Sequence, residues 1–393
     1  MVRRGRVAVV GGSLGGLTAA LLLRDSGHDV IVYERSAAEL EQRGAGIGFL
    51  PASSRYLAER AGVDLDEISI STKYIRYLDR QGLVIHEQKQ PYRFSNWNTV
   101  YRSLLRRFDR ERYLLGHECV DIHQEHGKVQ IMLADGKETE VDLLVCADGV
   151  GSRARSCLLP QVKPQYAGYV AWRGVVSEQE LGEDAVPFGD AITYHVYANS
   201  HILVYPIPGI DGSVRRGDRL INFVWYRNYL LGGDLIDLMT DSDNELHEVS
   251  LPPGTPRPVH IDEMRATAAA RLPERIARAV LAVKAPFVQA IFDLEVPQMS
   301  FGRVCLLGDA AFVVRPHAAA GTAKAASDAW ELARSLAEQP DFESALRAWE
   351  PGQLELGRNL LARTRRIGRR SQVDCNWTPG DPELIFGLYE PGR

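Results

Sequence analysis

A glycine-rich turn close to the start of the chain constrains its fold more than any other feature. The apolar run 6–10 leads into Gly11-Gly12-Ser13-Leu14-Gly15-Gly16, and an alanine- and leucine-rich stretch follows. This order is typical of a strand, a tight turn and a helix, in which glycines let the backbone approach a pyrophosphate and let the helix pack on its strand. Because the unpaired amides of a helix N-terminus favour anions, the segment predicts a dinucleotide-binding unit.

A second strand, within the segment 27–35, supports this prediction. It ends in Glu34, about 20 residues beyond the glycines, where a ribose-binding carboxylate belongs. A solvated charge at a strand end is the alternative interpretation of this residue. Ser13 stands where the pattern prefers its second glycine, and we interpret its hydroxyl as a phosphate donor. The predicted cofactor contacts of this region are Gly11, Ser13, Leu14, Gly15, Gly16, Glu34 and Arg35.

Two later segments have the character of further cofactor contacts. The apolar strand 142–147 runs into Asp148-Gly149 and then reaches Ser152 and Arg155, as in a loop that folds back over a cofactor. Much later, Gly308-Asp309 precedes Pro316 and Gly321. Cofactor-contacting segments that are separated by almost the whole chain indicate one long cofactor lying across the fold. We infer FAD.

In order and separation, these three motifs resemble those of the single-component class A flavoprotein aromatic hydroxylases, over residues 5–370. The resemblance implies an α/β fold: a Rossmann-like FAD-binding domain of the glutathione-reductase type, an inserted and mostly antiparallel β-sheet substrate domain, and C-terminal helices. The predicted boundaries are 1–72 with 98–164 and 296–338 for the FAD-binding domain, 73–97 with 165–295 for the substrate-binding domain, and 339–393 for the C-terminal helical region.

The resemblance also implies roles for individual residues. Asp309 would contact the ribityl chain of FAD, Arg102 the phosphate region, and the backbone near Val120 the adenine end. Asp148 and Arg155 would belong to a loop that serves both FAD and the nicotinamide. The turn at 319–322 would present backbone amides to the pyrimidine edge of the flavin. The implied contacts after residue 300 are Gly308, Asp309, Pro316, Ala319, Ala320, Gly321 and Thr322.

Two positions depart from the family pattern. Phe312 stands where many relatives have histidine, and Ala319 replaces the first glycine of a later Gly-x-Gly. The roles that depend on those two residues are left open.

The reaction implied by the resemblance is reduction of FAD by NADH or NADPH, formation of a flavin C4a-hydroperoxide with O2, and hydroxylation of an electron-rich ring. The run 315–326 is similar to a branch of the family that hydroxylates 2,6-dihydroxypyridine to 2,3,6-trihydroxypyridine in bacterial nicotine degradation. Two hydroxyl groups offset the electron deficiency of the pyridine ring and activate C3.

A base should withdraw a proton from the substrate hydroxyl, and four candidates can accept or relay it: His195, Tyr197, Tyr205 and His317. An ordinary hydrogen-bonded core histidine is the alternative at each histidine. Trp172, Trp225 and Tyr226 are candidates for the pocket lining, although sheet packing is the favoured role for at least two of them. Arg173 either holds an anionic substrate or pairs on the surface.

Composition narrows the class of protein further. A net charge of −5 and a pI near 6.1 give no reason to expect nucleic acid as a partner. Five cysteines without a CxxC pair suggest reduced thiols and a cytoplasmic location. We expect neither a membrane span nor a metal site. The oligomeric state stays open, with a homodimer among the options.

Other functions stay open at this stage. A nicotinamide-only dehydrogenase would leave Gly308-Asp309 without a role, and a flavin-dependent halogenase would be expected to carry Trp-x-Trp-x-Ile, which we do not find. A hydroxylase of a hydroxybenzoate-type substrate and a non-catalytic flavin-binding protein share the cofactor motifs. For the secondary structure, we expect residues 165–295 to be mostly strands and residues 322–371 to be helical, with interruptions near Pro340 and Pro351.

Overall fold

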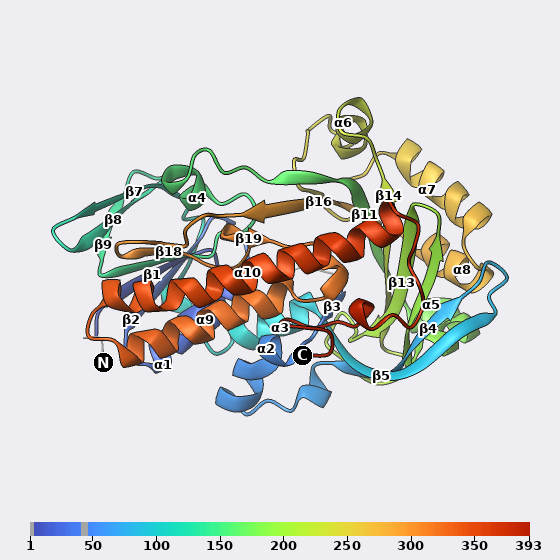
Figure 1. Ribbon diagram of the computed structural model, residues 1–393, viewed down its shortest axis with the longest axis horizontal. Coiled ribbons are helices and arrows are strands. Elements are labelled where there is room, and N and C mark those ends of the chain that lie inside the picture. Colours follow the sequence, from blue (N-terminus) through green and yellow to red (C-terminus); the bar gives the residue numbers. More distant parts are fainter. Residues whose placement is uncertain (1–3, 41–45) are drawn as a thin grey trace.

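The computed structural model of the protein describes residues 4–40 and 46–393 (Figure 1). Its first layer is a six-stranded sheet in which all neighbours except β17 and β18 run parallel. Near-continuous apolar runs such as Val7 to Val10 suit a parallel sheet that is buried on both faces. The strands, in spatial order, are β17 (Ser300–Phe301), β18 (Val304–Leu306), β10 (Leu143–Cys146), β1 (Arg6–Val10), β2 (Asp29–Glu34) and β6 (Tyr113–Leu115).

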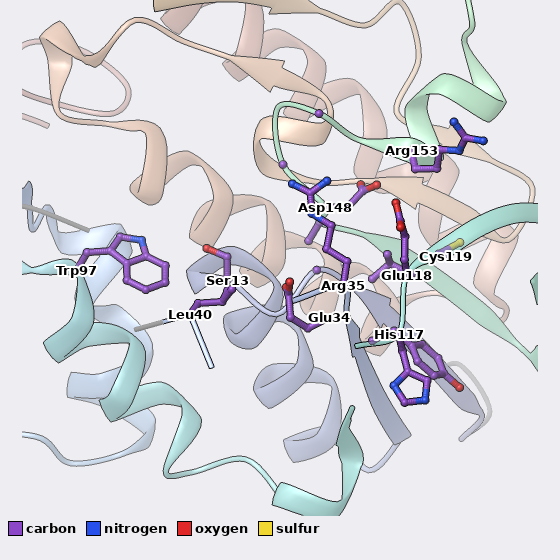
Figure 2. A pocket seen from close by; sticks show the side chains of 16 residues that line it. Ser13, Glu34, Arg35, Leu40, Trp97, His117, Glu118, Cys119, Asp148 and Arg153 are labelled. Atoms are coloured by element: carbon purple, nitrogen blue, oxygen red, sulfur yellow. The ribbon is translucent and has the colours of Figure 1, made fainter. Parts of the chain in front are cut away.

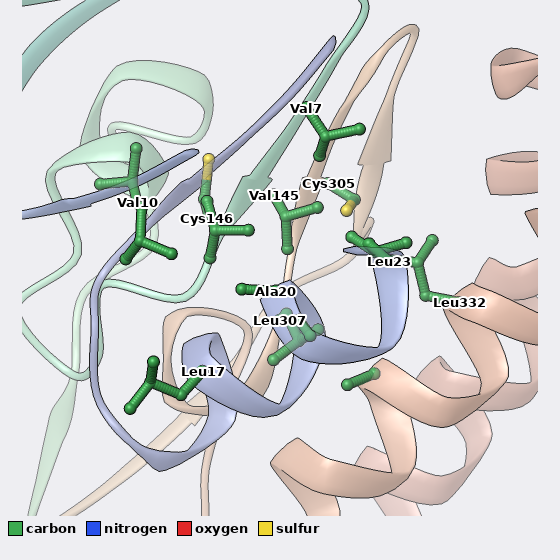
Figure 3. Close-up of a cluster of buried hydrophobic side chains, with 14 of the residues drawn as sticks. Val7, Val10, Leu17, Ala20, Leu23, Val145, Cys146, Cys305, Leu307 and Leu332 are labelled. Atoms are coloured by element: carbon green, nitrogen blue, oxygen red, sulfur yellow. The ribbon is translucent and has the colours of Figure 1, made fainter. Parts of the chain in front are cut away.

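Helices cover this sheet. α1 (Leu14–Asp25) packs between the sheet and α9 (Gly321–Glu338), and α9 lies beside the long helix α10 (Phe342–Gln372) (Figure 1). Figure 3 shows Val145 and Cys305 of the sheet facing Ala20 of α1 and Leu332 of α9, all at most 1% exposed. Each fully buried leucine in such a core stabilises the fold by about 2 kcal/mol.

The second layer is a ten-stranded, largely antiparallel sheet that lies at the C-terminal end of α10, away from the parallel sheet (Figure 1). Its two faces bury different clusters, because successive side chains of a strand point to opposite sides. Its strands, in spatial order, are β15 (Ser250–Leu251), β16 (Phe287–Glu295), β11 (Gln165–Ser177), β14 (Leu220–Asn228), β13 (Ser200–Ile207), β12 (Ala191–Tyr197), β4 (Ile70–Leu78), β5 (Val84–Asn96) and β3 (Gly46–Gly48), with β19 (Phe312–Val313) beside β16.

The remaining elements are smaller. A three-stranded sheet consists of β7 (Cys119–Glu125), β8 (Lys128–Leu133) and β9 (Glu138–Val141). The other α-helices are α2 (Pro51–Arg55), α3 (Trp97–Leu105), α4 (Arg153–Leu158), α5 (Glu178–Leu181), α6 (Gly233–Met239), α7 (Pro258–Arg271) and α8 (Glu274–Ala282). In the described part of the chain, no helix combines the length and the apolarity that crossing a membrane requires.

The predicted α/β architecture is confirmed, with two local differences. The segment 165–295 contains α7 and α8 between its strands, and α10 continues through Pro351, so the predicted interruption there is wrong. Proline frees the carbonyl of Arg347 four residues earlier. Arg347 and Pro351 are both on the exposed side of α10, where water can solvate that carbonyl, while Leu346 and Trp349 are buried. The chain does break at Pro340, between α9 and α10.

The predicted domain boundaries stay a prediction.

Candidate FAD and substrate site

The first component of the site is a cavity of about 180 Å³ at the carboxyl ends of β1, β2 and β10 (Figure 2). We call it the strand-end cavity. Crevices at this edge of an open parallel sheet are where nucleotides bind. Its lining consists of Val10, Gly11, Ser13, Tyr33, Glu34, Arg35, Leu40, Trp97, His117, Glu118, Cys119, Ala147, Asp148, Gly149, Gly151 and Arg153.

The glycine turn packs too tightly for side chains. Gly11 has φ +97°, and a Cβ placed there would lie 2.3 Å from the carbonyl oxygen of Ala147. A Cβ on Gly16 would lie 1.8 Å from the carbonyl oxygen of Gly11. The turn therefore brings bare backbone to the edge of the cavity, which suits a pyrophosphate. Ser13 lines the cavity, and its hydroxyl makes no capping bond to α1, so it is available to a ligand.

Glu34 is not a solvated charge. It is 5% exposed, and its carboxylate accepts hydrogen bonds from the amides of Gly12 at 2.9 Å and Ser36 at 2.8 Å. It also lines the strand-end cavity, so one carboxylate can both hold the turn and face a ribose. Its role as ribose ligand stays a prediction.

We expect Glu34→Ala to weaken FAD binding about tenfold, since a lost charged acceptor costs about 1.5 kcal/mol. Titration of the FAD-free protein with FAD, followed by flavin fluorescence, measures the effect. Glu118→Ala is the matched control, because Glu118 lines the same cavity. Equal losses in both variants would mean that Glu34 acts only through its charge.

The loop after β10 is joined to the late Gly308-Asp309 segment. Asp148 accepts the Ser152 hydroxyl at 2.6 Å, and burial raises the pKa of Asp148. Arg155 is 3% exposed and donates to the carbonyls of Val150 at 2.6 Å and Ala310 at 3.1 Å. A guanidinium thus ties two motifs together that are far apart in the sequence. Its position indicates that Arg155 supports the site from behind the two cavity linings.

The second component is a cavity of about 220 Å³ between the large sheet and the segment 309–322, which we call the central cavity. Aromatic and aliphatic side chains form most of its wall, and Arg173, Gln289 and Asp309 are its charged and amide groups. Its lining consists of Gly46, Ile47, Gly48, Phe94, Ala171, Arg173, Leu203, Tyr205, Val224, Tyr226, Gln289, Asp309, Val314, Pro316, Ala319, Ala320, Gly321, Thr322 and Phe386.

Asp309 opens into the central cavity between buried neighbours. Its side chain is exposed, whereas Gly308 and Ala310 are buried, and its carboxylate accepts no hydrogen bond from the described residues. Desolvation by the surrounding protein raises the pKa of Asp309 to about 6. A carboxylate that faces a cavity and has no hydrogen-bond donor in the described part of the protein can accept hydrogen bonds from the hydroxyl groups of a ribityl chain. Together with the bare glycine turn, it shows that the residues present fit FAD.

The raised pKa predicts a pH effect on the FAD-free protein. Because the folded-state pKa of Asp309 lies above its unfolded value, its contribution to stability is present below about pH 4 and is lost as the pH rises through about 6. We therefore expect Asp309→Asn to match the parent near pH 4 and to have the higher melting temperature at pH 8. Thermal unfolding across this range, with the exposed Asp234→Asn as control, tests it. A constant offset at every pH would contradict the assignment.

A buried ion pair on α9 is bonded to the residue that precedes Asp309. Lys324 donates to Asp328 at 2.7 Å, with side-chain exposures of 1% and 0%, and Asp328 also accepts the amide of Gly308 at 2.9 Å. The ammonium of Lys324 lies 4.8 Å from the ring centre of Phe312. Our sequence reasoning missed Lys324. Its spacing of four residues from Asp328, on an otherwise alanine-rich helix face, is the signal that would have found it.

The two departures from the family pattern have structural consequences. Phe312 is fully buried, and a Cβ on Gly357 would lie 2.6 Å from its ring, so helix α10 is fitted to this phenylalanine. Ala319 adopts the left-handed conformation with φ +53°, which costs an alanine about 1 kcal/mol. The turn that glycine usually makes is therefore retained, and Ala319 to Thr322 line the cavity at the start of α9.

Of the four candidate catalytic residues, the structure brings Tyr205 to the central cavity. Its hydroxyl donates to the Gly46 carbonyl at 3.0 Å. His317 lies behind the wall and bonds to the Tyr169 hydroxyl at 2.7 Å, and burial lowers its pKa far below the ordinary value. His195 bonds to the Leu78 carbonyl at 2.9 Å, and Tyr197 lines a separate surface groove. Neither lines the central cavity.

The aromatic candidates divide between the two faces of the large sheet. Tyr226 lines the central cavity. Trp172 and Trp225 are fully buried on the opposite face, where they pack with Met264 of α7 and Ile276 of α8. The prediction that at least two of the three serve sheet packing is confirmed. Arg173 is not a surface residue, because it lines the cavity and donates to the Gly46 carbonyl at 2.7 Å.

The remaining predicted cofactor residues lie outside both linings. Arg102 of α3 donates to the carbonyl of Ile210 at 3.1 Å, and Val120 follows the cavity residue Cys119 on β7. Their roles, like those of the other candidates, stay predictions. The predicted contacts outside both linings are Leu14, Gly15, Gly16, Arg102, Val120, Arg155 and Gly308. Gln289 and Phe386 line the central cavity, and the sequence analysis did not single them out.

One group among the described residues has ligand atoms close enough to hold a metal ion. The atoms of Asp241, Glu245 and His247 lie within 4.8 Å of one another. However, Asp241 already accepts His247 at 2.7 Å and the amides of Asp243 and Glu245 at 2.9 Å. The prediction that the protein needs no metal stays a prediction.

Comparison with known proteins shows which family models and relatives the chain matches. The family model described as pyridine nucleotide-disulphide oxidoreductase matches residues 5–186, the one described as FAD binding domain-like matches 166–293, and the one described as FAD binding domain matches 255–341. The chain is 39% identical to the 2,6-dihydroxypyridine 3-monooxygenase of Paenarthrobacter nicotinovorans, over 98% of this chain and 96% of the relative. The 6-hydroxynicotinate 3-monooxygenase of Pseudomonas fluorescens is 29% identical, over 97% and 94%.

Solved structures agree. The structure of 2,6-dihydroxypyridine-3-hydroxylase from Arthrobacter nicotinovorans superposes with a TM-score of 0.94 at 37% identity, covering 100% of this chain and 99% of that chain. Klebsiella pneumoniae HpxO, complexed with FAD and uric acid, superposes with a TM-score of 0.75 at 23% identity, covering 96% and 90%. At that identity the second likeness concerns the fold alone.

Proposed function

Because the chain belongs to the class A FAD-dependent aromatic hydroxylases, we propose that it converts 2,6-dihydroxypyridine into 2,3,6-trihydroxypyridine, as a step in nicotine degradation. The chain is a flavin-dependent monooxygenase that acts on small aromatic substrates with NAD(P)H and O2. Family membership decides against the dehydrogenase, halogenase and non-catalytic alternatives. The observation that carries the substrate assignment is the 39% identity over nearly the full chain.

FAD would supply the redox chemistry, accepting a hydride from NAD(P)H and activating O2 for transfer of one oxygen atom. The strand-end cavity would hold its nucleotide half, with Ser13 and Glu34 as polar contacts, and the 309–322 segment would hold the flavin half. The balance is one ring, one NAD(P)H, one proton and one O2 giving the trihydroxypyridine, NAD(P)+ and water. The hydrogen at C3 leaves as a proton when the ring regains its aromaticity.

The walls of the central cavity support a small, planar, acidic ring. Phe94, Tyr205 and Tyr226 offer ring faces, and the guanidinium of Arg173 offers a positive charge. A cation beside a hydroxyl group lowers the pKa of that hydroxyl. Arg173 would therefore favour the anionic ring, in which electron density at C3 is higher. Burial raises the pKa of Tyr205, so its phenol stays protonated and acts as a hydrogen-bond donor.

The substrate assignment is tested by offering 2,6-dihydroxypyridine, 4-hydroxybenzoate and salicylate to the FAD-loaded enzyme with NADH or NADPH. We expect the dihydroxypyridine alone to stimulate NAD(P)H oxidation strongly and to incorporate label from isotopic O2. Hydroxylation of either benzoate, with the dihydroxypyridine inert, would overturn the substrate while leaving the hydroxylase family unaffected.

We also propose a cytoplasmic enzyme that works without nucleic acid or a membrane, on the support of its five free cysteines and its net charge of −5. A homodimer is the assembly that we propose, and light scattering of the FAD-loaded protein tests it. A monomeric mass would overturn it.

A further inference from the structure

The last residues of the chain turn back towards the site. After α10 ends at Gln372, the segment 374–393 passes the large sheet and finishes near the middle of the molecule (Figure 1). We call it the C-terminal strap. None of the three cofactor motifs lies in it, and a tail without a function could equally have been left in solvent.

A buried arginine of α10 fixes the strap. Arg363 is 5% exposed and donates to the carbonyls of Gly387 at 3.0 Å and Glu383 at 3.2 Å, and to that of Ile385. An ion pair also holds the strap on α10, because Arg366 binds Glu383 at 2.9 Å. A guanidinium that donates to three carbonyl groups, one at every second residue from 383 to 387, holds this segment in a single path.

The strap joins the two walls of the central cavity. The amide of Phe386 donates to the hydroxyl of Tyr92 on β5 at 2.8 Å, and the amide of Gly387 donates to the carbonyl of Ala318 at 3.2 Å. Ala318 directly precedes the turn that opens α9. The strap therefore bonds to the large sheet on one side and to the 309–322 segment on the other.

Phe386 stands between two cavities. It is 5% exposed and lines both the central cavity and an outer cavity of about 410 Å³ that also contacts Arg93 and Arg393. Its ring stacks on Tyr92 at 4.6 Å and meets Phe94 edge-on at 6.4 Å, while Phe94 stacks on Tyr205 at 4.2 Å. The Phe386 ring is therefore a partition that separates the central cavity from the surface.

We propose that the C-terminal strap is part of the substrate site and that Phe386 is a specificity-determining residue, which restricts the cavity to one six-membered ring and keeps water out. This rests on the proposed function. Without the Phe386 ring, the central and outer cavities would merge. The merged space would accept a bicyclic ring, would hold a monocyclic ring less firmly, and would let water reach the reacting atoms.

The test compares Phe386→Ala and the milder Phe386→Leu with the parent, all loaded with FAD. Phe188→Ala is the matched control, because Phe188 is fully buried in the sheet cluster that holds Trp172 and Trp225. For Phe386→Ala we expect KM for 2,6-dihydroxypyridine to rise about tenfold, more of the NAD(P)H to yield H2O2 in place of product, and 2,4-dihydroxyquinoline to bind. We expect Phe386→Leu to lie between. Phe188→Ala should lose thermal stability only.

Binding of the two rings is also measured without turnover, from the change in flavin absorbance. If the parent hydroxylates no pyridine, the proposed function fails, yet the ratio of the two binding constants still tests the strap. A Phe386→Ala variant that binds FAD, excludes the bicyclic ring as the parent does and forms product as efficiently would overturn the proposal. The same change in ring preference in Phe188→Ala would overturn it as well.

Discussion

Gly16→Ala is expected to abolish retention of FAD and to lower the free energy of unfolding by about 3 kcal/mol or more. The added methyl group would lie 1.8 Å from the carbonyl oxygen of Gly11 and 3.4 Å from the side chain of Ala147. Backbone atoms cannot rotate away as a flexible side chain can, so the turn must open or α1 must lift from the sheet. Either change moves the amides that would face the pyrophosphate.

The flavin-to-protein absorbance ratio after gel filtration and a urea titration measure the two effects. Gly151→Ala is the control, because Gly151 lines the same cavity and a Cβ there meets no atom within 4 Å. We expect this control to retain FAD. A stable Gly16→Ala protein with a full complement of FAD would show that the turn is looser than its packing indicates.

Lys324→Met is expected to lower the free energy of unfolding by about 3 to 5 kcal/mol, the usual cost of leaving one partner of a buried ion pair alone. The orphaned carboxylate of Asp328 is fully buried, and burial already raises its pKa in the parent. Without the ammonium, that pKa rises further. A carboxyl group with a raised folded-state pKa loses stability as the pH rises, so the defect should be larger at pH 8 than at pH 5.

Chemical denaturation at both pH values measures this defect. Adding Asp328→Asn to Lys324→Met should recover most of the loss, because asparagine keeps an acceptor for the Gly308 amide and carries no charge. Lys163→Met, at an exposed lysine, should change stability by at most about 0.5 kcal/mol. If the double variant were as unstable as the single one, packing and not charge would explain the effect.

Local rules made part of the site predictable. The glycine turn, the acid at the end of β2 and the two later motifs each depend on a few neighbouring residues, and the structure places Gly11, Ser13, Glu34 and Asp148 around one cavity. The Lys324 and Asp328 pair could also have been read from its helical spacing. The departure at Ala319 was visible in the sequence, but only the structure gave its left-handed conformation.

The substrate half was not predictable in the same way. Trp172 and Arg173 are neighbours in the chain, yet one packs against helices and the other faces the central cavity, since adjacent residues of a strand point to opposite faces. Sequence shows the alternation but not which face will meet the 309–322 segment. Which of His195, Tyr197 and Tyr205 reaches the cavity also depends on which face of the sheet meets the 309–322 segment.

The sequence alone therefore determined the cofactor class, the βαβ unit and the order of the motifs, because a backbone turn and a strand end are encoded within short segments. Only the tertiary structure decided the shape of the central cavity. Its walls come from Gly46, Phe94, Arg173, Gln289 and Phe386, which are brought together by strand pairing, by Arg155 between two loops and by Arg363 on the strap. Contacts between residues so distant in the chain arise from packing of whole layers, and no local pattern records them.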